Sequence, residues 1–482
     1  MPKSLIIFFF VATVLLINFV IPPFQNPDEP QHFAAVMGFA NTGSVHNPPH
    51  AEIIRFMDQN QWWRYLGMGK PGEAPEKLER VPFLMGYYGV SDYTLLLNDI
   101  LIYHFGVGKL IGLLAKGNVP FAYYVVRLIS VLSLIGALYF FYRVFRNISE
   151  YSASPSAASW LMTGFFFILF LPQLLITAVA TNPDCVSVFL GAIFFWGAFS
   201  LIRQDYKFRI FIILVSAVMV GLIVDRANFF MLPVSLFALL FSADRKNLKK
   251  IFSALLFLLA ALALLFLSLK FFFPTQLIKG FNYANSHFPH GWREFISLFS
   301  INSFNKFFVL DLIDSFLLRF GWSAFSAAPA FYIIWLTIIA LAVIGIFASI
   351  VKAIFTKKID PNIPAKSSPL SYNARLHAHL PSRLIGFSLA AIFLQVIAVR
   401  MLATERNMFA QGRYFFPLVI PIAFLLVVGL KSFFDIFSKK VRLGTFAVKV
   451  FILFEFFFLN YVIWNDIIAV FHITLKSPHP GS

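Results

Sequence analysis

The sequence predicts an all-α polytopic membrane protein, and three observations carry that prediction. The chain of 482 residues is 59% hydrophobic but only 13% charged, which is about half the charged fraction of a typical soluble domain. Apolar runs of roughly 18 residues or more, long enough to cross a bilayer as a helix, recur along the whole chain. Short segments of strictly alternating apolar and polar residues, typical of an outer-membrane barrel, are absent.

The positions of the apolar runs predict about eleven transmembrane helices in a single membrane domain that covers residues 1–482. The expected spans are residues 4–21, 121–142, 158–178, 184–202, 209–225, 227–242, 251–273, 328–351, 384–402, 414–430 and 445–468. The first run follows Lys3 and continues into Pro22 and Pro23 without a small-x-small cleavage site. We therefore interpret it as a retained signal-anchor helix.

The distribution of basic residues predicts the orientation. If Lys3 is cytoplasmic, the loops after the second, fourth, sixth, eighth and tenth spans should carry an excess of Lys and Arg, and they do. Two long segments, 22–120 and 274–327, then fall on the external side. Within the first, the amphipathic stretch 93–114 is expected to lie on the membrane surface. The net charge of +17 thus reflects topology and does not indicate nucleic-acid binding.

Unusual polar residues gather on the predicted external side. They are Asp28, Glu29 and His32 after the first span; Asn182 and Asp184 in a short turn; Asp225 and Arg226; Arg319; and Gln411, Arg413 and Tyr414 before the tenth span. Each group has an ordinary alternative. Residues 28–29 could be a solvated turn between prolines, and Asp184 a helix N-cap. Residues 225–226 could form a structural ion pair, and Arg413 could reach the lipid headgroups.

Taken together, acids and arginines at one membrane face favour an enzyme that joins a water-soluble acceptor to an anionic, lipid-borne substrate. A carboxylate can accept a proton from a hydroxyl, and the planar guanidinium matches phosphate oxygens. His104 has no metal-ligand spacing and is expected at the interface. Glu455 and Lys449 lie six residues apart in the last span, so they do not share a helix face, and Glu455 has no assigned role. The single cysteine, Cys185, excludes a disulfide framework.

Several of these motifs occur in an order that resembles a known family. The segment Pro-Asp-Glu-Pro-Gln-His-Phe at 27–33 follows the first helix. An Asn-Pro-Asp turn stands at 182–184, a Ser-Phe…Phe-Gly-Trp segment at 315–322, and Gln-Gly-Arg-Tyr-Phe-Phe-Pro at 411–417. Over nearly its whole length the chain resembles the bacterial membrane proteins called domain of unknown function 2142, which are similar to the GT-C glycosyltransferases. One departure is Asp-Arg-Ala-Asn at 225–228, where the resemblance leads us to expect a Lys-Pro-containing stretch.

The resemblance implies a GT-C-like fold and a glycosyltransferase of the bacterial cytoplasmic membrane, with its active site on the external face. It assigns Asp28 as the catalytic base and Glu29 as its catalytic neighbour. A polyprenyl-phosphate sugar is the expected donor, and the acceptor is an unidentified glycan, lipid or protein. Arg413 is the best candidate to bind the donor phosphate, supported by Arg319 and Arg226.

Lower-ranked roles fall on the remaining polar residues. Asn182, Asp184, Gln411 and Tyr414 are expected near the acceptor or phosphate, and His32 either contacts substrate or packs locally. The sequence contains no recognisable set of metal ligands. A divalent cation that bridges the carboxylates to the donor phosphate stays an open possibility. The alternative functions are a lipid-linked sugar flippase or transporter, and a scaffold, polymerase or ligase of another fold.

Overall fold

A computed structural model gives the fold of the chain. It describes residues 3–26, 29–43, 49–60, 102–150, 155–203, 208–225, 228–242, 248–272, 312–313, 315–317, 319–320, 325–326, 329–356, 369–406, 412–437 and 441–464. Asp28, Arg226 and Gln411, which we predict to be site residues, lie outside these ranges. So do residues 61–101 and 273–311 of the two long segments that we expect on the external side.

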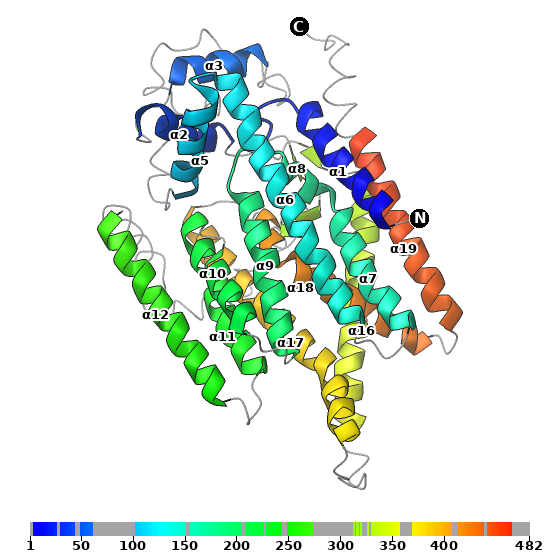
Figure 1. Cartoon of the computed structure of the whole chain (residues 1–482). Coiled ribbons are helices and arrows are strands. Elements are labelled where there is room, and N and C mark those ends of the chain that lie inside the picture. Colours follow the sequence, from blue (N-terminus) through cyan, green and yellow to red (C-terminus); the bar gives the residue numbers. More distant parts are fainter. Residues whose placement is uncertain are drawn as a thin grey trace.

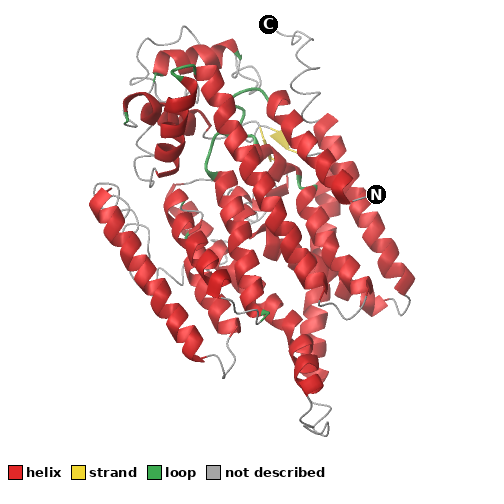
Figure 2. Ribbon diagram, in the orientation of Figure 1, coloured by secondary structure: helices red, strands yellow, loops and turns green. Residues whose placement is uncertain are grey.

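The described elements are nearly all helical (Figures 1 and 2). The helices are α1 (Lys3–Val20), α2 (Glu29–Thr42), α3 (His50–Gln59), α5 (Ile102–Ala115), α6 (Val119–Glu150), α7 (Pro155–Leu169), α8 (Pro172–Ala178), α9 (Asp184–Ile202), α10 (Phe208–Val224), α11 (Met231–Ser242), α12 (Leu248–Phe272), α16 (Pro329–Thr356), α17 (Pro369–Arg406), the 3₁₀ helix η6 (Gly412–Leu418), α18 (Val419–Phe437) and α19 (Val441–Tyr461). Two short strands, β1 (Arg319–Phe320) and β2 (Phe325–Ser326), pair antiparallel.

The chain has the helices of a multi-pass membrane protein. Six described helices are long and apolar enough to cross a bilayer, or seven if the bent pair α7 and α8 is one span. Large apolar side chains face outward, and Phe271 of α12 is 81% exposed, as expected where lipid and not water surrounds a helix. The remaining apolar helices, among them α1, α5, α10 and α11, have shorter apolar stretches.

One predicted span is divided in two. The run that we expect to form a single helix over 158–178 bends by 48° between α7 and α8. Pro172 stands at the first turn of α8. A proline has no N–H to donate and clashes with the preceding turn, so it begins a helix more easily than it continues one. Because of this break, α8 runs in a different direction from α7, and its C-terminal end leads into the loop before α9.

The long helices form a bundle around one apolar core, with α9 near its centre. Helix α6 packs against α7 and α9, and α16 packs against α18. At that second crossing, a Cβ atom on Gly345 would collide with the backbone of Gly429, so glycine permits the close approach. Figure 1 shows α2, α3 and α5 gathered at one end of the bundle, beside the N-terminal part of α6. These helices enclose a second, smaller core.

Candidate functional site

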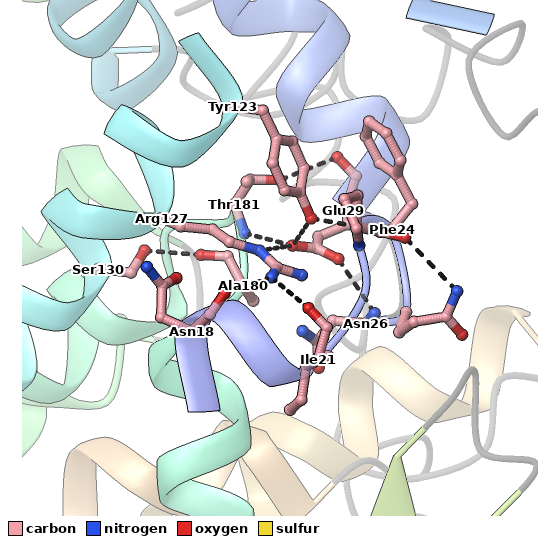
Figure 3. A network of polar contacts seen from close by, with 12 residues as sticks. Asn18, Ile21, Phe24, Asn26, Glu29, Tyr123, Arg127, Ser130, Ala180 and Thr181 are labelled. Atoms are coloured by element: carbon pink, nitrogen blue, oxygen red, sulfur yellow. Dashed lines mark hydrogen bonds and ion pairs between the residues drawn. The ribbon is translucent and has the colours of Figure 1, made fainter. Parts of the chain in front are cut away.

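The turn between α1 and α2 is organised around the buried carboxylate of Glu29 (Figure 3). Its Oε1 accepts hydrogen bonds from the Tyr123 hydroxyl at 2.8 Å and the Thr181 backbone N–H at 3.0 Å. The same oxygen forms an ion pair with Arg127 Nε at 3.4 Å. Its Oε2 accepts the backbone N–H of Asn26 at 3.1 Å. Both carboxylate oxygens of Glu29 are therefore engaged by protein donors.

Arg127 connects the same carboxylate to the C-terminal end of α1. Its Nη1 donates to the carbonyl oxygens of Asn18 at 3.1 Å and Ile21 at 2.8 Å, and its Nη2 to that of Pro22 at 3.0 Å. The last carbonyls of a helix have no partners within the helix and attract cations. The guanidinium of Arg127 therefore caps the C-terminal end of α1 and also binds Glu29, the first residue of α2.

These contacts assign Glu29 a structural task. Because it is 0% exposed and surrounded by donors, its side chain stabilises the turn after α1. Asp28, the residue directly before it, lies outside the described part of the chain. Its assignment as the base thus stays a prediction, but its neighbour Glu29 is held by four groups of the protein.

A second polar cluster forms where α9 begins. The Oδ2 atom of Asp184 accepts a hydrogen bond from Asn182 Nδ2 at 2.9 Å and forms an ion pair with Arg413 Nη1 at 3.4 Å. The guanidinium of Arg413 lies 5.6 Å from the ring centre of Tyr414. The side chains of Asp184 and Arg413 are each 13% exposed. Four residues that we predict to belong to one site are therefore close together.

One short loop connects the two clusters. Thr181 donates its backbone N–H to the Glu29 carboxylate and its hydroxyl to the Glu29 carbonyl oxygen at 3.2 Å. The next residue, Asn182, contacts Asp184 in the second cluster. The preceding Ala180 accepts a hydrogen bond from Ser130 of α6 at 2.7 Å. The loop between α8 and α9 thus contacts Glu29 through Thr181 and leads directly to Asp184, which pairs with Arg413.

The approach of Arg413 depends on two glycines. A Cβ atom on Gly191 of α9 would collide with the backbone of Pro417 in η6, and one on Gly412 would collide with the backbone of Leu312 and Phe316. Gly412 also donates its N–H to the Ser315 hydroxyl at 2.6 Å. Close packing of η6 on α9 therefore sets where Arg413, the second residue of η6, meets Asp184.

A third group of polar residues extends the second cluster along α9. Ser187, one helical turn after Asp184, donates to Asp225 Oδ2 at 3.1 Å and accepts from Asn228 Nδ2 at 3.0 Å. Asn228 also donates to the carbonyl oxygen of Gly221 at 3.3 Å. Asp225 is thus engaged by α9, whereas its neighbour Arg226 lies outside the described residues. The contact ties the break between α10 and α11 to the start of α9.

His32, one turn into α2, pairs with His104 of α5. His32 Nδ1 lies 2.8 Å from His104 Nε2, and the rings are nearly parallel at 7°. His104 is 2% exposed. Burial lowers the pKa of His104 well below its ordinary value, and His32 lowers it further. His104 is thus a buried partner of a candidate site residue, and its expected place at the membrane interface stays a prediction.

Some site residues were missed from the sequence, and others are only partly described. Arg319 lies in β1, where its backbone pairs with Ser326. Tyr123, Arg127 and Thr181 complete the first cluster but were not predicted. Arg127 carried a usable signal, because an arginine inside an apolar span is rarely retained without a partner or a function. Thr181 carried no such signal.

The described residues contain no group of three or more His, Cys, Asp or Glu side chains placed to hold a metal ion. A divalent cation at the carboxylates stays an open prediction, since Asp28 is not among them.

Comparison of the chain with models of known protein families, with curated proteins and with solved structures finds no match.

Proposed function

We propose that the chain is a GT-C-like glycosyltransferase of the bacterial cytoplasmic membrane. It would move a sugar from a polyprenyl-phosphate donor to an acceptor on the external face, with inversion of configuration at the anomeric carbon. The observation that carries this proposal is the Arg413–Asp184 ion pair. The loop between α8 and α9 connects this pair to the hydrogen-bond network of Glu29. The proposal includes eleven spans, a cytoplasmic N-terminus and a role in cell-envelope polysaccharide synthesis.

The acid–base step belongs to Asp28 in this proposal. The acceptor oxygen attacks the anomeric carbon as the bond from that carbon to the phosphate oxygen breaks. Asp28 takes the proton of the acceptor hydroxyl, and polyprenyl phosphate leaves with the bonding electrons. General-base help of this kind accelerates a reaction by about 10²–10⁴-fold.

Arg413 supplies the positive charge for the leaving phosphate. Its guanidinium is held by Asp184 but still 13% exposed, which leaves surface for a phosphate oxygen. An oriented cation in a water-poor site stabilises developing negative charge without having to reorganise. Asn182 contributes by orienting the Asp184 carboxylate that holds the arginine.

The Glu29 network has a positioning role in the proposal. A catalytic group displaced by 1 Å can lose about 10²-fold in rate. Asp28 directly precedes a residue fixed by Tyr123, Arg127 and Thr181. This fixed position of Glu29 supports the proposal that Asp28 is the catalytic base.

The test is transfer by purified protein in liposomes, with lipid-linked sugars from bacterial membrane extracts as the donor source. Asp28→Asn should reduce transfer by at least 10²-fold, and Arg413→Ala should weaken donor use while the protein stays folded. Arg146→Ala is the matched control, since Arg146 is 55% exposed and forms its ion pair with nearby Glu150, away from both polar clusters.

Transfer by Asp28→Asn at the wild-type rate would remove Asp28 as the base. A parallel measurement separates the alternative function. If the protein moves lipid-linked sugar across vesicles but releases none from its lipid, it is a flippase or transporter. Arg413→Ala that fails to fold would instead indicate that the ion pair with Asp184 is structural.

A further inference from the structure

Glu455 in α19 is the buried ionisable group that the proposed site does not use. It lies at the centre of the candidate membrane span Phe446–Trp464, nine residues from either end. Its side chain is fully buried. Neither carboxyl oxygen has a hydrogen-bond partner among the residues that the structure describes. An ionisable group in the middle of a membrane span is a candidate functional site for that reason alone.

Among the described residues, Glu455 lies on a helix face with aromatic neighbours. On α19 it shares the buried face with Phe451 and Phe458. Trp335 of α16 packs against both rings, at 6.3 and 6.4 Å between ring centres. Lys449, the other charged residue of this span, is exposed and lies on a different face. The described structure therefore gives Glu455 no counter-ion.

The same interface holds a second polar group without a partner. The indole of Trp335 is 1% exposed, and its Nε1 has no hydrogen-bond acceptor among the described residues. Trp335 also contacts Phe167 of α7 at 5.4 Å. Glu455 and Trp335 thus lie in one aromatic cluster where α7, α16 and α19 meet.

An ionised carboxylate is unfavourable in such a place. Burial of a charge in an apolar medium requires a paired ion or several donors, and otherwise the group takes up a proton and becomes neutral. This protein provides such donors where it keeps a buried carboxylate, because four groups engage Glu29. Among the residues that the structure describes, none donates a hydrogen bond to Glu455.

We propose that Glu455 is a proton-binding site within the membrane, which holds its proton at neutral pH as an uncharged carboxylic acid. The ligand is the proton itself. The site is independent of the proposed glycosyl transfer, since it involves other helices and no residue of the two polar clusters.

Reaction with a hydrophobic carbodiimide tests the proposal on the full-length protein in detergent. The acid proton moves to a carbodiimide nitrogen as the carboxyl oxygen bonds to the central carbon. The adduct rearranges to an N-acylurea, so the whole reagent is added and nothing leaves. Mass spectrometry should find this adduct at Glu455 near neutral pH, at a yield that falls as the pH is raised.

Three controls come from the same chain. Glu455→Gln should remove the adduct from that peptide. Glu29, surrounded by donors, should stay unmodified. Glu150, which is 52% exposed, should react with a water-soluble carbodiimide that spares Glu455. Modification of Glu455 by the water-soluble reagent as fast as Glu150 would overturn the proposal.

Infrared spectroscopy provides a measurement that does not depend on access of a reagent. A protonated carboxyl group has a C=O stretching band separate from that of a carboxylate. Wild-type protein at neutral pH should show such a band, and Glu455→Gln and Glu455→Leu should both lack it. Identical spectra of wild type and both variants in this region would overturn the proposal.

Discussion

Glu29 and Glu455 are both 0% exposed, but their surroundings are opposite. Glu29 begins α2 and accepts hydrogen bonds from a phenol and two backbone amides, besides its ion pair with Arg127. Glu455 lies in the middle of α19 with no hydrogen-bond partner among the described residues. The same side chain is thus used as an anchored anion in one region and as an isolated acid in the other.

The comparison shows that burial alone does not define the state of a carboxyl group. A buried ion pair is favourable only when good geometry and further hydrogen bonds offset the loss of water. Arg127 meets this condition, because its remaining N–H groups cap the carbonyls at the end of α1. Without such partners, a carboxyl group is more stable when neutral.

The largest effect should come from removal of the cation beside Glu29. Arg127→Met leaves an unpaired buried carboxylate and three uncapped carbonyls, so we expect a loss of about 3–5 kcal/mol in the free energy of unfolding. The measurement is denaturant unfolding in detergent. The double variant Glu29→Gln with Arg127→Met should be less destabilised than the single variant, because no charge is left alone. Equal or greater loss in the double variant would contradict the proposed ion pair.

A smaller loss is expected at Tyr123, the neutral donor of the same network. Tyr123→Phe removes the hydroxyl that donates to Glu29 and accepts from the Phe24 N–H at 2.8 Å. An unsatisfied buried group costs about 1–3 kcal/mol, measured as above. Tyr124→Phe is the matched control, since that adjacent ring is only partly buried, and it should change stability by less than about 0.5 kcal/mol. Similar losses at both positions would argue against a specific role for the hydroxyl.

His104 presents an intermediate case, a buried base paired with another base. The pKa of His104 is lowered by burial and then by His32, and the Tyr103 ring packs against it at 5.2 Å. As the pH falls below about 6.5, His104 becomes protonated in the unfolded chain but stays neutral in the folded protein. The free energy of unfolding should therefore decrease as the pH is lowered, by at most about 1.4 kcal/mol per pH unit.

The pH effect is measured as the difference between wild type and His104→Gln from pH 7.5 down to pH 5.5. The variant should lose part of the pH dependence, because glutamine does not titrate. Parallel curves for the two proteins would show that His104 is as easily protonated in the folded state as in the unfolded state.

Much of the fold could be predicted from the sequence, because apolar runs and helices are both local. Each of the eleven predicted runs overlaps a described helix, α7 and α8 sharing one. How many of these helices cross the membrane is a separate question, since six or seven of the described helices are long and apolar enough to do so. Pro172 marks where one run breaks, but the angle depends on packing.

The candidate site was less accessible from the sequence because its contacts join distant residues. Asn182 and Asp184 were identified together, and Asp184 forms an ion pair with Arg413, which lies far away in the sequence. The partner of Glu29 is 98 positions away, and no local pattern links the two. Arg127 and Glu455 carry the same sequence signal, a charge within an apolar run. Only the tertiary structure shows that one has a partner.

The smallest effect is expected at Glu455, and it makes the comparison quantitative. Glu455→Gln replaces an uncharged acid with an uncharged amide of the same shape, so stability should change by less than about 1 kcal/mol. Glu29→Gln removes a charge that Arg127 requires, and should cost about 3–5 kcal/mol. Unfolding of the two variants in the same detergent measures the difference directly. If Glu455→Gln is as destabilising as Glu29→Gln, Glu455 is an ion with a partner, and the contrast between the two glutamates disappears.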